Sequence, residues 1–138
     1  MAMKKILCLL LLVFPISAHT QDLREVTQTI HLYFEGMMER NRDKLDQAFI
    51  PEAKLIGYRG SELFITPFEE WAGSTAKGER REPSQYVNEI KGIRIVGSMA
   101  LAETELHWPG IRYVDFLTLI KVQGKWKIVH KSWHEIPQ

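Results

Sequence analysis

The stretch Val114 to Glu135, VDFLTLIKVQGKWKIVHKSWHE, decides the fold of this chain. It has the pattern of two long β-strands joined by a tight turn at Gln123-Gly124. Side chains on a strand alternate between two faces, and cross-strand partners in a hairpin share a face. A two-residue turn therefore predicts these pairs: Lys121 with Trp126, Leu119 with Ile128, Leu117 with His130, and Asp115 with Ser132.

Further strands precede this hairpin, and helices precede the strands. Turn residues at Gly97-Ser98 and Pro109-Gly110 divide residues 86–122 into three strands, so that residues 86–135 form a four-stranded antiparallel meander. Apolar residues at helical spacing predict a helix over residues 22–40, capped by Asp22, and Asn41 begins a short second helix. Short strands over 54–58 and 63–66, a short helix after Pro67 and a loop over 73–84 complete the chain. Helices first and a long sheet last indicate an α+β domain.

The first twenty residues differ from the rest of the chain. Lys4 and Lys5 precede a short apolar run, and small residues follow it up to Thr20. This order is typical of a secretory signal peptide, and the apolar run is too short to span a bilayer. We expect an exported protein, periplasmic or secreted, with cleavage after Ala18 or Thr20 and no membrane attachment afterwards. The single cysteine, Cys8, lies inside the apolar run, so the mature chain contains no disulfide.

Composition bounds the function only loosely. The chain has 138 residues, enough for one domain over residues 21–138, and its net charge of +1 favours neither nucleic acid nor an anionic membrane as partner. Dinucleotide fingerprints, phosphate-binding glycine loops and nucleic-acid motifs are absent from the sequence. We therefore expect no cofactor.

The predicted register gives the face of the sheet under the helices two zones. One zone is apolar, and the other mixes polar and aromatic side chains near one end of the strands. Buried polar groups are costly unless they pair or meet water, so a small polar-lined cavity is expected there. Its predicted lining is Trp71, Lys91, Thr104, Trp108, Tyr113, Asp115, His130 and Ser132, with Tyr33 as a further wall.

The opposite face of the sheet mixes charged and apolar side chains. Phe116, Val129 and Trp133 are its large apolar residues near the centre of the hairpin. An apolar patch of this kind favours a partner, most simply a second copy of the chain. An exposed sheet face with scattered apolar residues is the alternative.

Taken together, the segments HLYFEGMMERNRDKLDQAFIPEAKL and VDFLTLIKVQGKWKIVHKSW and the order of elements resemble the nuclear-transport-factor-2-like, or ketosteroid-isomerase-like (SnoaL-like), superfamily. Within it, the chain is most similar to the branch labelled putative lumazine-binding. The resemblance implies a cone-shaped α+β barrel, with a pocket between helices and sheet and dimers formed through the sheet. The superfamily contains isomerases, dehydratases and pure binding modules, so the resemblance leaves the activity open.

The resemblance also implies roles for two residues. Isomerases of the superfamily use a carboxylate in the cone, which makes Asp115 the candidate general base. Tyr33 matches the place of a helix-borne tyrosine that donates to an oxyanion. The residues themselves leave simpler roles open: Asp115 as a hydrogen-bond acceptor for Ser132, Thr104 or His130, and Tyr33 as a core side chain.

Two other kinds of site are disfavoured by spacing. His130 and His134 share a strand face but lie roughly 13 Å apart, too far for one metal ion, so no metal site is expected. Ser132, His130 and Asp115 lack the strained turn that presents a hydrolase serine. The sequence therefore predicts an exported domain that binds a small organic molecule. The alternatives are an isomerase or dehydratase using Asp115, and a dimeric module without catalysis.

Overall fold

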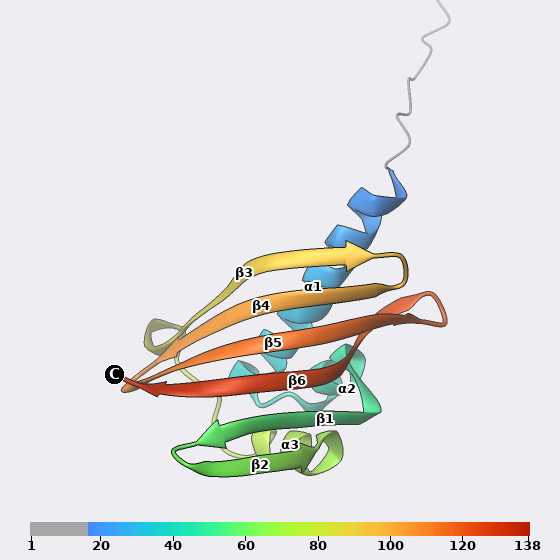
Figure 1. Ribbon diagram of the computed structural model, residues 1–138. Helices are drawn as coiled ribbons and strands as arrows, with labels where there is room; N and C mark the ends of the chain where they lie inside the picture. The colour runs from blue at the N-terminus through green and yellow to red at the C-terminus, as the bar shows by residue number, and fades with distance from the viewer. Residues whose placement is uncertain (1–16) are drawn as a thin grey trace, which may run out of the picture.

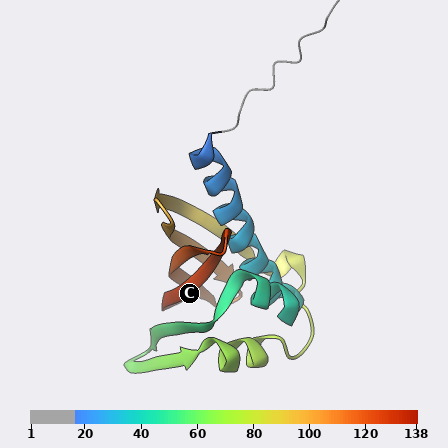
Figure 2. The same cartoon turned by 90° about the vertical axis from the view of Figure 1, so that its right-hand side faces the viewer.

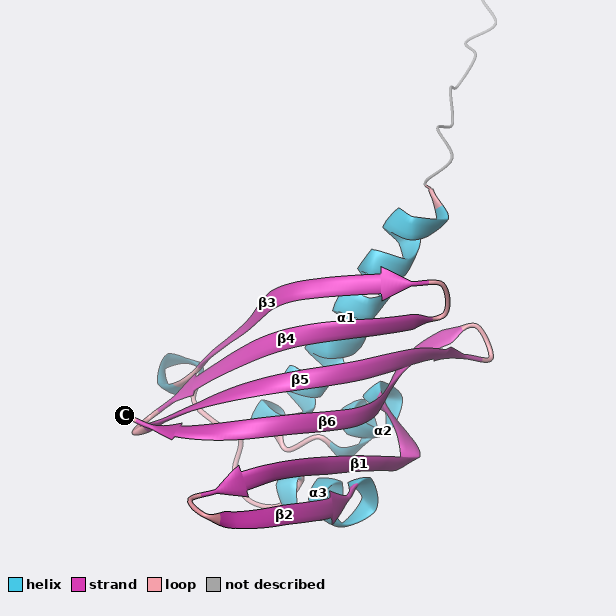
Figure 3. Ribbon diagram, in the orientation of Figure 1, coloured by secondary structure: helices cyan, strands magenta, loops and turns pink. Residues whose placement is uncertain are grey.

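The computed structural model describes residues 17–138, and one six-stranded sheet forms its framework (Figures 1 and 3). The strands are β1 (Phe49–Arg59), β2 (Glu62–Pro67), β3 (Val87–Val96), β4 (Met99–Trp108), β5 (Ile111–Val122) and β6 (Lys125–Pro137). Their order is β2-β1-β6-β5-β4-β3. The predicted antiparallel meander is confirmed for β3 to β6, and β1 joins its edge by pairing parallel to β6.

Three helices pack on one face of this sheet, which curves around them without closing into a barrel (Figure 2). They are α1 (Ala18–Glu39), α2 (Arg42–Ala48) and α3 (Phe68–Thr75), and a single 3-10 turn covers Pro83–Gln85. The predicted α+β class is confirmed. Within the described residues, no helix is long and apolar enough to cross a membrane. Residues 1–16, most of the predicted signal peptide, lie outside the described part of the chain.

Helix α1 begins earlier than the sequence predicts. Ser17 caps it by accepting a hydrogen bond from the Thr20 backbone N–H at 3.2 Å. The predicted cap, Asp22, instead accepts hydrogen bonds from Lys121 Nζ at 2.7 Å and Trp126 Nε1 at 3.0 Å. Asp22 thereby fastens α1 to the tip of the β5–β6 hairpin. Asn41 caps α2 as predicted, through the Lys44 backbone N–H.

The core lies between the three helices and the inner face of the sheet. It contains the predicted apolar zone and the apolar stripe of α1. Its largest fully buried side chains are Tyr33, Phe49, Phe68, Ile30, Leu45, Leu55, Leu106, Leu117, Leu119 and Ile128. Gly36 lets α2 approach α1, since a Cβ there would lie 2.6 Å from Leu45 Cδ2.

A β-bulge in β6 changes the register of the central hairpin. Leu119 pairs with Ile128 as predicted, but the next pair is Thr118 with His130, so Val129 is an extra residue on its strand. A shift of one residue moves every later side chain to the other face. The predicted pairs Leu117–His130 and Asp115–Ser132 are therefore wrong.

The bulge decides which residues of β6 face the helices. Leu117 lies opposite Lys131 and Asp115 opposite Trp133, so Lys131 and Trp133 point inward. His130 and Ser132 share the outer face with Phe116. Trp133 is thus wrongly predicted as an outer-face residue, and His130 and Ser132 are wrongly predicted as inner ones.

A second bulge, in β3, has the same effect on Lys91. Ile90 pairs with Thr104 and Gly92 with Glu103, which leaves Lys91 as the extra residue. Lys91 lies 3.7 Å from Glu89 at the surface, with 44% of its side chain exposed. The prediction that Lys91 points inward is therefore wrong.

The outer face of the sheet carries exposed apolar side chains between charged ones. Phe116 is 48% exposed and Leu101 50% exposed, and both help to line a shallow hollow together with Arg94 and Glu103. Val129, in the bulge, is half-buried. Of the three residues predicted for a partner surface, Phe116 alone is an exposed outer-face residue.

Candidate functional site

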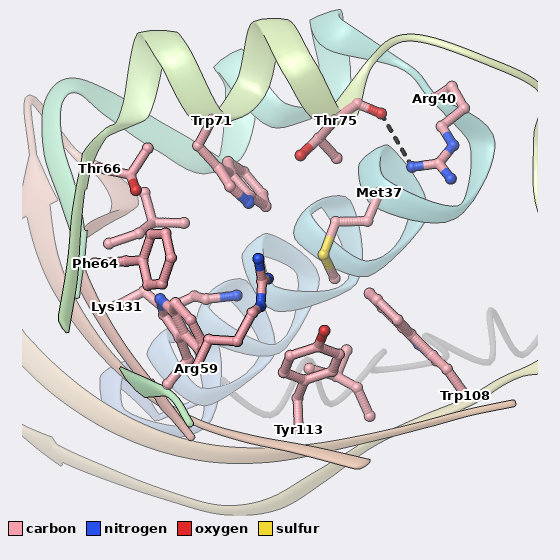
Figure 4. Close-up of a pocket in the computed structure, with 13 residues that line it drawn as sticks. Met37, Arg40, Arg59, Phe64, Thr66, Trp71, Thr75, Trp108, Tyr113 and Lys131 are labelled. Carbon is pink, nitrogen blue, oxygen red and sulfur yellow. Dashed lines mark hydrogen bonds between the residues drawn. The ribbon is translucent and has the colours of Figure 1, made fainter. Parts of the chain in front are cut away.

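A cavity of about 300 Å³ opens between α1, α3 and the inner face of the sheet. Pockets of this size bind small organic molecules in other proteins. Figure 4 shows how its side chains converge from both layers. The lining residues are Met37, Arg40, Leu55, Arg59, Phe64, Thr66, Trp71, Thr75, Leu106, Trp108, Tyr113, Lys131 and Trp133.

Five aromatic side chains form much of the cavity wall. Trp108 and Tyr113 meet edge-to-face with ring centroids 5.1 Å apart, and Tyr113 meets Trp133 at 6.3 Å. Phe64 lies 6.4 Å from Trp133, and Trp71 faces the sheet from α3 (Figure 4). A wall of flat, weakly polar rings favours a flat ligand.

Gly57 makes the position of Trp133 possible. It is the β1 partner of Trp133, and a Cβ at this position would lie 2.3 Å from Trp133 Cδ2. Only a glycine lets the indole lie flat across β1 at this point. The close approach therefore ties the shape of the cavity to a single backbone position.

Beneath the aromatic wall lies a buried polar group of three residues, Tyr33, Asp115 and Lys131. The Tyr33 hydroxyl donates to Asp115 Oδ2 at 2.5 Å, and Lys131 Nζ donates to the Tyr33 hydroxyl at 2.7 Å. Lys131 Nζ also lies 3.2 Å from Asp115 Oδ2. Asp115 and Tyr33 have no exposed surface, and 8% of the Lys131 side chain is exposed.

These three residues differ in their access to the cavity. Lys131 lines it, whereas Asp115 and Tyr33 lie behind Lys131 and do not. The ammonium also lies 5.0 Å from the centroid of the Tyr33 ring and 5.4 Å from that of Trp71, within cation–π range. The charge that a ligand meets is therefore the Lys131 ammonium rather than the Asp115 carboxylate.

Burial also governs the protonation of Tyr33. Burial, and then the neighbouring Asp115 charge, hold the pKa of Tyr33 well above its ordinary value, so Tyr33 stays a hydrogen-bond donor. Asp115 Oδ1 is buried with no hydrogen-bond partner among residues 17–138, as is the Thr104 hydroxyl oxygen from the facing position on β4. The carboxylate is thus held from one side only.

An ion pair lies at the edge of the cavity. Arg59 Nε is 3.1 Å from Glu135 Oε2, and its guanidinium lies over the rings of Phe64 and Trp133 at 5.3 and 5.8 Å. Burial, and then the Glu135 charge, raise the pKa of Tyr113. Glu135 is therefore paired with Arg59. Among the described residues, the cavity lining contains three cationic side chains and no carboxylate.

The predicted site residues separate into three groups. Trp71, Trp108 and Tyr113 line the cavity; Tyr33, Thr104 and Asp115 lie buried behind it; Lys91, His130 and Ser132 are displaced from the inner face by the two bulges. Sequence reasoning missed Lys131 and Trp133. One signal could have found them: the adjacent apolar pair Ile128-Val129 interrupts the alternation that begins at Trp126, and an interruption of this kind is where a bulge can occur.

A possible metal-binding group lies elsewhere, on the outer face. Glu89, Glu105 and His107 place ligand atoms within 4.8 Å of one another. Arg112 Nη1, 3.6 Å from Glu105, and Lys91, 3.7 Å from Glu89, already neutralise the carboxylates. This surface group is separate from the cavity and includes neither His130 nor His134.

Comparisons with known proteins place the chain among proteins of this fold. The model of the family described as "Putative lumazine-binding" matches residues 21–134. A nuclear-transport-factor-2-like protein of unknown function from Shewanella baltica superimposes with a TM-score of 0.79 at 26% identity, covering 89% of this chain and 100% of that one. Another, from Silicibacter pomeroyi, gives a TM-score of 0.79 at 22% identity, covering 87% and 100%.

One relative carries the name of an enzyme. The chain is 26% identical over 118 residues to "Aldolase FrzH" from a Cladobotryum species, which covers 82% of this chain and 90% of the relative. These similarities confirm the resemblance to the nuclear-transport-factor-2-like superfamily.

Proposed function

From the premise that this chain belongs to the putative lumazine-binding family of nuclear-transport-factor-2-like domains, we propose that it binds a small, flat organic molecule in the cavity. The ligand carries an anionic or strongly polarised oxygen that faces Lys131. One observation carries the proposal: a nearly buried ammonium lines an aromatic cavity whose described lining contains no carboxylate.

The charge of Lys131 is kept in place by groups that the ligand does not touch. An ammonium has three N–H donors; one is used by the Tyr33 hydroxyl, and the ion pair with Asp115 directs a second. At least one donor therefore remains for a ligand oxygen. A hydrogen bond between two charged groups in a dry site is stronger than a neutral one, so a carboxylate or enolate is favoured over a neutral ring.

The test compares 2-naphthoate with 2-naphthamide, which have the same ring and differ in charge. Binding is measured by titration calorimetry or by quenching of tryptophan fluorescence. We expect tighter binding of the carboxylate, and a loss of at least about tenfold in its affinity when the ammonium is removed, because a charge-assisted hydrogen bond is worth about 1.5–3 kcal/mol.

The variant is the double substitution Lys131→Met with Asp115→Asn, which removes both charges of the pair and so leaves no uncompensated buried ion. Lys125→Met, an exposed lysine on the same strand, is the matched control. Equal binding of 2-naphthoate by the wild type and the double variant would refute the proposal.

Catalysis through an enolate is a second candidate, favoured by the same ammonium and by the relative named as an aldolase. Lys131 would stabilise an enolate oxygen, with Tyr33 and Asp115 holding its side chain in place. Asp115 stays the candidate general base through its unpartnered Oδ1, which lies behind the cavity lining.

Hydrogen–deuterium exchange at the carbon next to the carbonyl of 2-tetralone tests this candidate. We expect exchange above the buffer rate with the wild type and loss of the excess with Asp115→Asn. Exchange at the buffer rate with the wild type would exclude enolisation of this probe.

We also propose export to the periplasm or outside the cell, on the grounds of the basic and apolar N-terminus. The intact mass of the protein recovered from cell fractions tests this. An exported chain begins at His19 or Gln21, and recovery of the full-length chain in the cytoplasmic fraction would contradict the proposal.

A further inference from the structure

Two arginines meet at the end of α1, beside the cavity. Arg40 adopts a left-handed conformation, with φ at 57°, where α1 ends. Its Nε donates to the Glu79 carbonyl and its Nη1 to the Thr75 carbonyl, each at 3.1 Å (the latter dashed in Figure 4). The Arg81 backbone N–H donates to the Met38 carbonyl at 2.8 Å, which holds the loop after α3 against α1.

Neither guanidinium has a carboxylate partner within residues 17–138. Arg40 bonds only to carbonyl oxygens, and Arg81 lies over the ring of Trp108 at 4.5 Å, with its Nε buried and without a hydrogen-bond partner. Glu79 supplies its backbone carbonyl to Arg40. Burial lowers the pKa of Arg40, and the charge of Arg81 lowers it further.

Arg40 and Trp108 both line the cavity, and Arg81, which is not part of the lining, lies beside it over the Trp108 ring. Two adjacent guanidinium groups repel each other, and an anion between them removes the repulsion while accepting several N–H donors in their planar geometry. The unpartnered Nε of Arg81 is a donor of this kind. A neutral ligand group would leave both charges uncompensated.

We infer that Arg40 and Arg81 form an anion subsite that binds a second anionic group of the ligand, a carboxylate or a phosphate. This inference rests on the proposed function, since it adds a second charge to the flat ligand bound at Lys131. The substrate class becomes an aromatic or heteroaromatic molecule with two separate acceptor groups, one facing Lys131 and the other at the end of α1.

The first arm of the test uses inorganic phosphate and the thermal unfolding of the full chain. We expect the melting temperature to rise by about 5 °C at roughly ten times the phosphate Kd. Arg81→Met keeps an apolar side chain over Trp108 and is expected to lose this rise. Arg80→Met, the neighbouring exposed arginine, removes the same charge and should keep it.

The second arm compares naphthalene-2,6-dicarboxylate with 2-naphthoate. We expect about tenfold tighter binding of the dicarboxylate by the wild type and by Arg80→Met, and equal binding of the two compounds by Arg81→Met. Added phosphate should weaken the binding of the dicarboxylate and leave that of 2-naphthoate unchanged, because phosphate competes for one subsite only.

The outcomes separate the inference from the proposed function. If phosphate stabilises the wild type and Arg81→Met equally, the subsite is refuted. If the phosphate effect needs Arg81 but the dicarboxylate has no advantage, the subsite takes a free anion and its assignment to the ligand is overturned. The proposed function fails on a different result, unchanged 2-naphthoate binding after removal of the Lys131 and Asp115 charges.

Discussion

Removal of the Lys131 ammonium alone should destabilise the fold severely. In Lys131→Met, Asp115 keeps its hydrogen bond from Tyr33 but loses the cation that lies 3.2 Å from its Oδ2. The Asp115 side chain is fully buried, so water does not replace that cation. Coulomb's law at an effective dielectric constant of about 20 gives roughly 5 kcal/mol for unit charges at this separation. Removal of one partner of a buried ion pair costs about 3–5 kcal/mol.

The companion variants show whether the cost comes from an uncompensated charge. Asp115→Asn leaves a buried ammonium and should also lose about 3–5 kcal/mol, whereas the double variant buries no charge and should lose less than either single one. The assay is urea unfolding at pH 7, followed by circular dichroism. Lys125→Met, exposed on the same strand, should stay within about 0.5 kcal/mol of the wild type.

The reasoning fails on either of two results. A loss of less than about 1 kcal/mol in Lys131→Met would mean that water or rearrangement compensates the carboxylate. Losses that add in the double variant would mean that the two residues stabilise the fold independently, contrary to the short distance between their charges.

Three further predictions concern alkaline pH, the cavity wall and the outer face. The unfolded chain loses the Tyr33 proton near pH 10 while the folded chain, with its raised pKa, keeps it, so stability falls as pH rises above 10. Urea unfolding at pH 9 and 11 measures this decline in the free energy of unfolding. In Tyr33→Phe the decline should be smaller than in the wild type, by up to about 1.4 kcal/mol per pH unit. Gly57→Ala places a Cβ 2.3 Å from Trp133 Cδ2, and should cost about 1–3 kcal/mol and weaken 2-naphthoate binding. We propose that Phe116 lies in a two-fold interface with a second copy, so Phe116→Lys should give a monomer in analytical ultracentrifugation.

Controls for these variants lie on the same sheet. Gly92→Ala adds a methyl group that meets no atom within 4 Å and should leave ligand binding unchanged. Val87→Lys changes an exposed strand residue remote from Phe116 in the sequence and should leave the dimer intact. The Tyr33 prediction is contradicted if the free energy of unfolding of Tyr33→Phe and of the wild type falls equally with pH. The Gly57 prediction is contradicted if Gly57→Ala binds 2-naphthoate as tightly as the wild type. The Phe116 prediction is contradicted if the wild type is itself a monomer.

The meander was predictable because each of its turns is specified by residues that are adjacent in the sequence. Gly97, Gly110 and Gly124 have positive φ values of 58°, 76° and 77°, and Gln123, just before Gly124, has a φ of 49°. Two consecutive residues with positive φ match the twist of a hairpin. The same local signals, with alternating apolar residues, are sufficient to identify the strands and the face on which the helices pack.

The site was predictable only as far as the first bulge. The bulge in β6 places Lys131 where it donates to Tyr33, 98 residues away in the sequence, and the neighbouring residues alone do not reveal such a contact. Pairing rules applied outward from the turn carry the register past Ile128 without interruption, and each later residue is then assigned to the wrong face. Asp115 was expected opposite Ser132, whereas in the structure it lies opposite Trp133 and accepts a hydrogen bond from Tyr33.

The buried Tyr33–Asp115–Lys131 group is costly to the fold if stability is its only role. A buried ion pair gains little over apolar residues of the same volume, and replacement by such residues is often neutral or stabilising. Here the carboxylate even retains one oxygen without a partner among residues 17–138. The bulge that carries Lys131 inward also carries Trp133 into the cavity wall, so the charge and the aromatic surface arise from one irregularity. The proposed ligand, which would contact both the Lys131 charge and the Trp133 ring, accounts for a polar group that costs the core stability.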